Sequence, residues 1–124
     1  MANASSLGQF EQLVLTAILT LGENAYGVTI HAAVEDLSKP KKAALGAVYA
    51  TLDRLEDKSL ITSWLSDPTP ERGCRSRRYY KLEDAGAAAL HEAGLTAKRI
   101  CDVIERSWGE GVWKPGKWKP VRQP

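Results

Sequence analysis

The sequence has little cysteine and no long hydrophobic run. Its two cysteines, Cys74 and Cys101, fall in different predicted elements and outside any Cys-x-x-Cys pair, so we interpret both as free thiols. The longest apolar run, Leu13 to Leu21, is interrupted by threonine and is shorter than the roughly 20 residues that cross a bilayer. No Lys or Arg precedes it, which argues against a secretory signal. We expect a cytoplasmic protein that does not enter a membrane.

Residue patterns of common enzyme sites are also missing. The sequence contains no Gly-rich phosphate loop, no Gly-x-Ser-x-Gly turn and no carboxylate pair beside a histidine. The histidines, His31 and His91, lie on different predicted helices without the spacing of metal ligands. We therefore expect neither an enzyme nor a metal or cofactor site.

What remains is the composition of an ordinary globular domain. Of the 124 residues, 44% are hydrophobic and 26% are charged, and the net charge is only +2. Such a small net charge gives little overall attraction to nucleic acid, so any case for DNA binding depends on where the charges lie.

Apolar residues at helical spacing predict three helices in the first half of the chain. The first follows Ser6 and Gln9, a capping-box pattern, and ends at Gly22. The second runs from Tyr26 to Leu37, and the third begins around residues 43–46. On the third helix the residues predicted to point inward are Leu45, Val48, Leu52 and Leu55.

A change of spacing at Ile61 predicts a β-hairpin. Residues 61–65 and 77–82 form its strands, and the turn-rich residues 66–76 form a long tip. Alternation along the second strand directs Tyr80 and Leu82 towards the core. Trp64 is interpreted as a core residue or a cover of the hairpin.

A fourth helix is predicted from Glu83 or Asp84 to about Arg106. Five of its residues are spaced 3, 4, 3, 4, which is typical of a short coiled-coil seam. The first helix carries apolar residues on a second side, which predicts a packing partner beyond its own core. We predict a homodimer whose interface contains Leu15, Leu19, Leu90, Ala93, Ala97, Ile100 and Ile104.

Three helices, a hairpin and a final helix follow the order of a winged helix-turn-helix. The expected fold is therefore mainly α with a small β component. We divide it into a DNA-binding domain over residues 1–83, a dimerisation helix over 84–108 and a tail with Trp, Lys and Pro over 109–124.

The predicted hairpin tip and its second strand are basic. Residues 71–81 hold five Lys or Arg and one Glu, a net charge of 5 − 1 = +4. Arginines clustered on such a wing suit phosphate oxygens, although a solvated tip that only aids solubility is the alternative. A second basic cluster precedes the third helix. The phosphate-contacting candidates are Lys41, Lys42, Arg72, Arg75, Arg77 and Arg78.

The outer face of the third helix is small at its N-terminal half and acidic beyond it. Gly46, Tyr49 and Ala50 make a slim surface that can approach base edges, with Thr51 and Arg54 on its flanks. The acidic half would repel phosphate, so only the N-terminal half is expected to enter a groove. Tyr49 as a partly buried packing aromatic is the alternative.

Four segments in this order resemble the PadR family of bacterial regulators over about Leu7 to Leu95. They are Tyr26-Gly27-Val28-Thr29-Ile30, Gly46-Ala47-Val48-Tyr49-Ala50-Thr51-Leu52-Asp53-Arg54-Leu55-Glu56, Leu60-Ile61 and Arg78-Tyr79-Tyr80-Lys81-Leu82. The resemblance implies a dimeric winged-helix repressor that dimerises through its C-terminal helix and is released by a small molecule. The sequence departs from the family pattern at Ala50, where proline is frequent, at Ser59, where glycine is usual, and at Glu83, where threonine is usual.

The expected partners are a second copy of the chain, an inverted-repeat operator in double-stranded DNA, and a planar aromatic or cationic effector. Trp108 and Trp113 are the candidates for an effector pocket, because flat aromatics can sandwich such ligands. Packing of Trp108 in the dimer interface is the alternative for that residue. The alternative for the whole protein is a winged-helix module that binds protein rather than DNA.

Overall fold

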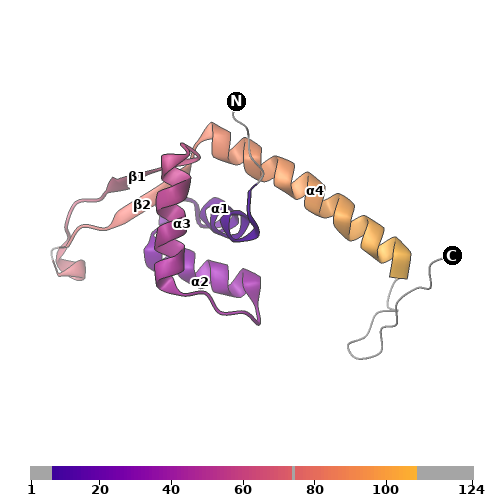
Figure 1. Cartoon of the computed structure of the whole chain (residues 1–124). Helices are drawn as coiled ribbons and strands as arrows, with labels where there is room; N and C mark the ends of the chain where they lie inside the picture. Colours follow the sequence, from indigo (N-terminus) through magenta and orange to yellow (C-terminus); the bar gives the residue numbers. More distant parts are fainter. Residues whose placement is uncertain (1–6, 74, 109–124) are drawn as a thin grey trace. The chain divides into compact units, whose positions relative to one another are not determined.

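A computed structural model of the chain describes residues 7–73 and 75–108, which form α-helices and one two-stranded sheet (Figure 1). The helices are α1 (Gln9–Leu21), α2 (Gly27–Ser38), α3 (Leu45–Asp57) and α4 (Asp84–Trp108), and the strands are β1 (Ile61–Leu65) and β2 (Arg78–Leu82). Two short 3-10 turns, η1 (Gly22–Asn24) and η2 (Pro70–Arg72), complete the order. This order confirms the predicted winged helix-turn-helix. No helix of the described residues is both long and apolar enough to span a membrane.

Helices α1, α2 and α3 enclose the core together with the sheet. The residues that are almost fully buried include Val14, Leu15, Ile18, Ile30, Val34, Val48, Leu52, Leu55, Ile61 and Tyr80. Most positions predicted to point inward do so. Leu45 does not: it is the first residue of α3 and is 42% exposed.

The start of α1 differs from the predicted capping box of Ser6 and Gln9. The helix begins at Gln9 with Gly8 as its N-cap, and Glu11 Oε1 accepts a hydrogen bond of 3.0 Å from the Gly8 backbone N–H. Ser6 lies outside the described residues. The far end agrees with the prediction, because Gly22 ends α1 with a positive φ of 59°.

Strands β1 and β2 form one antiparallel ladder in which Trp64 pairs with Tyr79 and Leu65 with Arg78. The short segment before α2 pairs with the free edge of β2. The Tyr80 N–H donates to the Ala25 carbonyl at 2.9 Å, and Tyr26 forms an isolated antiparallel β-bridge with Tyr79. This pairing fixes the first turn of α2 beside the hairpin, although the two segments lie far apart in sequence.

Ser59 has a left-handed backbone, with φ of 62°, directly after α3. Its N–H donates to the Glu56 carbonyl, and the next residue, Leu60, donates to Leu55, so the backbone needs this conformation to end the helix. A residue with a Cβ adopts it at a cost that glycine does not bear.

We therefore expect Ser59→Gly to raise the free energy of unfolding by about 1 kcal/mol, because it removes the Cβ strain at positive φ. Urea denaturation of the variant and of the original chain measures the difference. Ser107→Gly, inside helical backbone, is the matched control and is expected to lower stability. A lower stability for Ser59→Gly would contradict the assignment of strain.

Helix α4 is continuous over Asp84–Trp108, close to the predicted range. The chain divides into two compact units, Met1–Ala93 and Gly94–Pro124, so the first turns of α4 belong to the unit that holds the core. Within that unit Gly86 is buried against the Leu60 backbone. The second unit carries exposed apolar residues of α4, which are Leu95, Ile100, Val103, Ile104 and Trp108.

Candidate DNA-binding site

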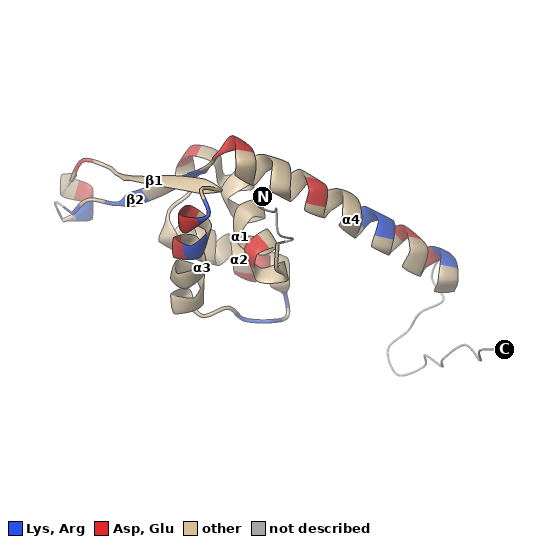
Figure 2. Cartoon of the chain, turned by 45° about the horizontal axis from the view of Figure 1, so that its top comes forward, with Lys and Arg blue, Asp and Glu red and all other residues tan. Residues whose placement is uncertain are grey.

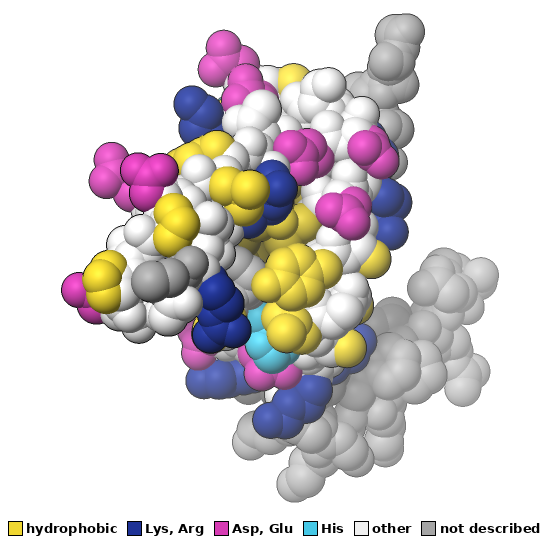
Figure 3. Space-filling view, turned by 90° about the vertical axis from the view of Figure 1, so that its left-hand side faces the viewer, with side chains coloured by type: hydrophobic (Ala, Val, Ile, Leu, Met, Phe, Trp, Pro, Cys, Tyr) yellow, Lys and Arg dark blue, Asp and Glu magenta, His cyan; other side chains and the backbone are white. Residues whose placement is uncertain are grey.

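The wing arginines and the third helix line one groove of about 550 Å³. Tyr49 of α3 and the start of α2 form one side, and the hairpin forms the other. The basic residues that line the groove are Arg72, Arg75, Arg77 and Arg78. On the face shown in Figure 3, Lys and Arg side chains lie directly beside a central group of hydrophobic side chains. The structure therefore brings the four wing arginines to the same groove as Tyr49, one of the third-helix residues predicted to contact DNA.

Arg77 is positioned by two tyrosines. Its guanidinium carbon lies 3.9 Å from the centre of the Tyr26 ring, and its Nη1 donates to the Tyr79 hydroxyl at 3.4 Å. Tyr26 and Tyr79 meet edge to face, with 5.5 Å between ring centres. A cation held over an aromatic face keeps its charge while losing freedom of movement. Arg77 is thus presented to the groove in a defined orientation.

Hydrogen bonds to serines position two further arginines. Arg78 Nη1 donates to Ser63 Oγ at 2.8 Å, and that hydroxyl donates to the Glu56 carboxylate at 2.8 Å. Arg72 Nη2 donates to Ser66 Oγ at 3.1 Å and to the Asp67 carbonyl at 2.8 Å. Because these contacts tie the wing to strand β1 and to α3, the basic side chains are held at one site.

The exposed face of α3 has the narrow profile that the sequence predicts. Tyr49 is 43% exposed, and Gly46 and Ala50 are exposed beside it. The Tyr49 hydroxyl lies against Gly27, where any Cβ would overlap it. Tyr49 is thus packed at its hydroxyl end and yet 43% exposed, and its contact with DNA stays a prediction.

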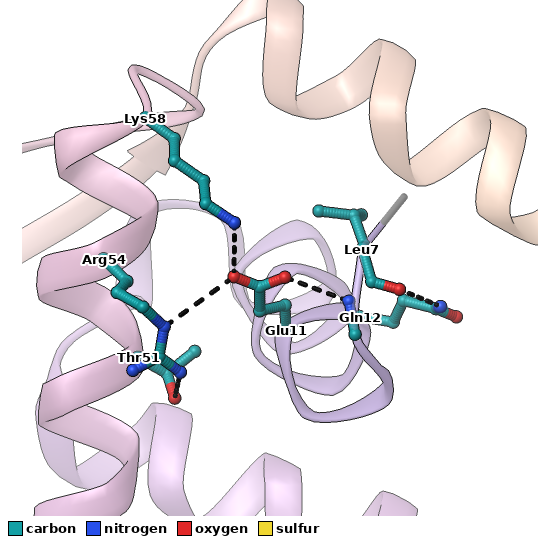
Figure 4. A network of polar contacts seen from close by, with 7 residues as sticks. Leu7, Glu11, Gln12, Thr51, Arg54 and Lys58 are labelled. Carbon is teal, nitrogen blue, oxygen red and sulfur yellow. Dashed lines mark hydrogen bonds and ion pairs between the residues drawn. The ribbon is translucent and has the colours of Figure 1, made fainter. Parts of the chain in front are cut away.

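Of the two residues predicted to flank the DNA-facing surface, Thr51 is buried and Arg54 is exposed. Thr51 is only 2% exposed, and its hydroxyl accepts a hydrogen bond of 3.2 Å from Arg54 Nη2. Arg54 Nε lies 3.9 Å from Glu11 Oε2, so the guanidinium turns towards α1 (Figure 4). The burial of Thr51 removes it from the predicted DNA-facing surface, whereas the Arg54 side chain is 57% exposed and its contact with DNA stays a prediction.

Glu11 links α1 to α3 from an almost buried position. It is 8% exposed, and Lys58 Nζ donates to its Oε2 at 2.9 Å (Figure 4). The hydrogen bond from Lys58 is the main cause that holds the pKa of Glu11 below its ordinary value, with the Gly8 N–H and Arg54 adding to the effect against the opposing effect of burial. The carboxylate therefore fixes where α3 lies on α1.

We expect Glu11→Gln to lower the free energy of unfolding by about 1–2 kcal/mol at neutral pH, because Lys58 and Arg54 lose their anionic partner. Since the folded-state pKa is depressed, the contribution of Glu11 is present at neutral pH and is lost as pH falls below the ordinary glutamate pKa of about 4.3. Urea denaturation over this acid range is expected to show a shallower pH dependence for the variant. The exposed Glu92→Gln serves as the control, and identical pH profiles for all three proteins would exclude this role.

Lys41 and Lys42 lie on the loop between α2 and α3, separate from the wing groove (Figure 2). Two hydrogen bonds hold the end of this loop on α2. His31 Nε2 lies 2.6 Å from the Ala43 carbonyl oxygen, and the Ala43 N–H donates to the Glu35 carboxylate at 3.0 Å. Both lysines are exposed. The loop is thus an ordered second basic segment, next to the N-terminus of α3.

Residues assigned to the dimer interface fall into three environments. Leu15 is fully buried in the core of its own chain, because strand β2 covers α1 in addition to α2 and α3. Leu19 is 59% exposed at the end of α1, and Leu90 packs partly against the core. The seam residues that remain accessible are Ala93, Ala97, Ile100 and Ile104.

The other predicted site residues are distributed as follows. Trp108 is the last residue of α4, at the boundary of the described range, and Trp113 lies outside it. Cys101 is an exposed free thiol and Cys74 is not among the described residues. Within residues 7–73 and 75–108, no group of three His, Cys, Asp or Glu side chains is arranged to hold a metal ion.

Several residues that build the groove were not assigned from sequence. Alternation along the second strand places Tyr79 on the same face as Arg77 and Lys81. The contact between Arg77 and Tyr79 can therefore be predicted from this pattern. Tyr26 carries no such signal, because it reaches Arg77 from a segment distant in sequence, and the serines that hold Arg78 and Arg72 belong to no recognisable local pattern.

A wing packed beside an exposed helix face defines the class of winged-helix proteins. The sequence matches the model of the transcriptional regulator PadR-like family over residues 14–92. The chain belongs to this family. No curated protein sequence gave a match.

Solved structures share the fold at low sequence identity. A PadR family transcription regulator of Clostridium difficile R20291 is 24% identical, with a TM-score of 0.67 over 82% of this chain and 100% of its own. A PadR-like regulator of Bacillus cereus is 20% identical, with a TM-score of 0.66 over 80% and 90%. BpsR of Bordetella bronchiseptica, whose DNA binding is regulated by 6-hydroxynicotinic acid, is 19% identical, with a TM-score of 0.62 over 94% and 74%.

Proposed function

We propose that the protein is a homodimeric, sequence-specific repressor that binds an inverted-repeat operator in double-stranded DNA. The observation that carries this proposal is the groove in which four wing arginines and Tyr49 meet. Arginines supply sequence-independent contacts to phosphate, whereas a helix face in the major groove reads base edges. The site contains both kinds of group within one unit of the chain.

In this proposal the N-terminal half of α3 enters the major groove. Gly46, Tyr49 and Ala50 face the bases, because all three are exposed and the two small residues beside Tyr49 let the helix approach closely. The acidic residues follow in the later turns: Asp53 and Asp57 are exposed, while Glu56 accepts the hydrogen bond from Ser63. Repulsion between these carboxylates and phosphate directs the C-terminal half of α3 away from DNA.

The wing and the lysine loop contact the backbone on either side of that helix. Arg72, Arg75, Arg77 and Arg78 release condensed counterions when they neutralise phosphates, which makes binding steeply dependent on salt. Lys41 and Lys42, next to the N-terminus of α3, add positive charge where the helix dipole also favours phosphate.

The homodimer forms through the exposed apolar face of α4. Ala97, Ile100 and Ile104 are exposed in the chain, and burying such residues against a second copy removes apolar surface from water. Two-fold symmetry then requires half-sites about one helical turn of DNA apart. Sedimentation at micromolar concentration tests this step, and a monomer there is incompatible with it.

A small-molecule effector is proposed to release the repressor. Support comes from BpsR, a protein of the same fold whose DNA binding is regulated by 6-hydroxynicotinic acid. Trp108 and Trp113 stay proposed contacts for such a ligand, because tryptophan provides a large flat surface for planar or cationic groups.

The test is a titration of the full chain against DNA from its own promoter region and against unrelated DNA, at two salt concentrations. We expect binding to the promoter to be at least about 1,000-fold tighter than to unrelated DNA, and both affinities to fall as salt rises. A protein-binding module would show neither effect. Absence of preference between the two DNAs, or binding that ignores salt, would overturn the proposal.

A further inference from the structure

Val28 is a large apolar side chain that the core of the chain does not use. It lies in the first turn of α2 and is 62% exposed. The buried side chains of this helix are Ile30 and Val34, and helical spacing puts Val28 on another face. Ala32 and Asp36, which follow Val28 at intervals of four on that face, are small or charged. Packing within the chain therefore gives no reason for a valine at this position.

Val28 lines the wing groove together with Tyr49 of α3. The Tyr49 hydroxyl lies against Gly27, the residue before Val28, so the first turn of α2 and the exposed face of α3 meet here. Tyr49 is 43% exposed and Val28 is 62% exposed, so both remain accessible from the groove. We call these two residues the apolar patch of the groove.

The surroundings of the apolar patch are cationic. Four arginines line the same groove, and the carboxylate among the lining residues is that of Glu71. This excess of positive charge favours a polyanion as the occupant. It disfavours a second copy of the chain, whose net charge is also positive. The occupant must therefore place an apolar group against Val28 and Tyr49 while its anionic groups lie within reach of the arginines.

Double-stranded DNA offers one group of this kind on its base edges. In the major groove the C5 methyl of thymine is the apolar group, whereas the other distinguishing groups are hydrogen-bond donors or acceptors. An apolar side chain that covers a donor or acceptor leaves it without a partner, which costs free energy. The same side chain against a methyl group removes apolar surface from water on both sides. The apolar patch thus favours thymine at the position that it covers.

We propose that Val28 and Tyr49 contact the C5 methyl group of a thymine in each operator half-site. Val28 is then a specificity-determining residue on α2, in addition to the residues of α3 that face the bases. This inference rests on the proposed function, since it names a base that the DNA-binding site reads.

Replacing thymine with uracil removes this methyl group and leaves base pairing unchanged. The test titrates the full chain by fluorescence anisotropy against promoter DNA amplified with thymidine or with deoxyuridine nucleotides. Burial of one methyl group corresponds to about threefold to fourfold in affinity for each half-site, so the homodimer should bind the uracil DNA about tenfold more weakly. Unrelated DNA, bound mainly through its phosphates, should show no such difference. Amplified DNA carries no 5-methylcytosine, so the difference reports thymine alone.

Val28→Ala separates the proposed contact from other effects of uracil. The substitution removes the two methyl groups of Val28, so its affinity for thymine DNA should fall about tenfold and the difference between the two DNAs should shrink to about threefold or less. Leu37→Ala is the matched control, because Leu37 is 48% exposed and lies on the same helix about 13 Å along its axis from Val28. This control should keep the full difference. Circular dichroism shows that each variant is folded.

Three results would overturn the inference. Equal affinity for thymine and uracil DNA would show that the protein reads no thymine methyl group. A difference that Val28→Ala leaves unchanged would assign the effect of uracil to DNA shape or to other residues. Loss of the difference in Leu37→Ala as well would show that any change in α2 has this effect.

Failure of this inference is distinguishable from failure of the proposed function. A chain that prefers its promoter in a salt-dependent way, but gives one of these three results, keeps the proposed function and loses the thymine contact. A chain that binds neither thymine nor uracil DNA loses both.

Discussion

Replacing Arg75, Arg77 and Arg78 together with alanine is expected to weaken binding to promoter and unrelated DNA alike. A homodimer loses six guanidinium groups in this variant, and each phosphate contact contributes about 0.9 to the slope of log affinity against log salt. We therefore expect the slope to fall by about 5 and affinity at about 0.1 M salt to fall on the order of 1,000-fold. Fluorescence anisotropy at several salt concentrations measures both quantities.

The loss should be uniform because, in the proposed complex, these side chains face phosphate rather than bases. Arg77 over Tyr26 and Arg78 on Ser63 are held on the hairpin, across the groove from Tyr49. Preference between the two DNAs is expected to survive in the arginine variant, whereas Tyr49→Ala should reduce it. A loss of preference in the arginine variant would show that the wing reads sequence.

The control removes the same charge from another element. Lys98, Arg99 and Arg106 lie on α4, and their replacement with alanine also lowers the charge of each chain by three. If DNA affinity depends on net charge alone, the two triple variants lose the same amount of DNA affinity. That result would show that the wing arginines make no specific contact with DNA. Thermal unfolding of each variant separates loss of contacts from loss of fold, since Arg77 also packs on Tyr26.

The helices and strands can be predicted from sequence periodicity, because buried residues recur at regular short intervals along each element. The inward stripe of α3 repeats at Val48, Leu52 and Leu55, and all three are buried. Thr51 belongs to the same stripe by spacing, but its hydroxyl makes it look like a surface residue. The structure buries it and satisfies the hydroxyl with Arg54. Spacing was the better guide there than polarity.

The errors and omissions at the site come from contacts that no local pattern encodes. The apolar spacing of α1 assigns Leu15 to a second, free side of the helix, yet Leu15 is fully buried within its own chain. Likewise, Arg77 was recognised as basic, but its position depends on Tyr26, which reaches it only because Ala25 and Tyr26 pair with β2. A sequence read residue by residue identifies the charges of the wing. It does not identify Tyr26, the ring on which Arg77 lies.

Gly86→Ala is expected to cause the largest loss of stability, about 2–3 kcal/mol, because the site has no room for one methyl group. Gly86 is buried in the first turn of α4, and a Cβ there would overlap the carbonyl oxygen of Leu60. For a domain of this size the expected fall in the unfolding temperature is on the order of 10–15 °C. Differential scanning calorimetry at a fixed protein concentration measures it.

The Leu60 carbonyl cannot yield easily, because hydrogen bonds fix it on both sides. It accepts one of 3.0 Å from the Glu83 N–H, and the Leu60 N–H donates one of 3.0 Å to the Leu55 carbonyl. Relief of the overlap therefore requires α4 to move off the start of β1 or the helix-ending turn to open. Either change breaks backbone hydrogen bonds inside the unit that carries the wing.

Gly94→Ala is the matched control within the same helix. Among the described residues, no atom outside the neighbouring backbone of the helix lies within 4 Å of a Cβ at Gly94, so the added methyl group mainly restricts the unfolded chain. We expect this variant to be more stable by about 0.5–1 kcal/mol. If Gly86→Ala lowers the free energy of unfolding and Gly94→Ala raises it, glycine is required at residue 86 because of the contact with Leu60. Equal effects would mean that α4 responds to helix propensity alone and that its first turn is not fixed against β1.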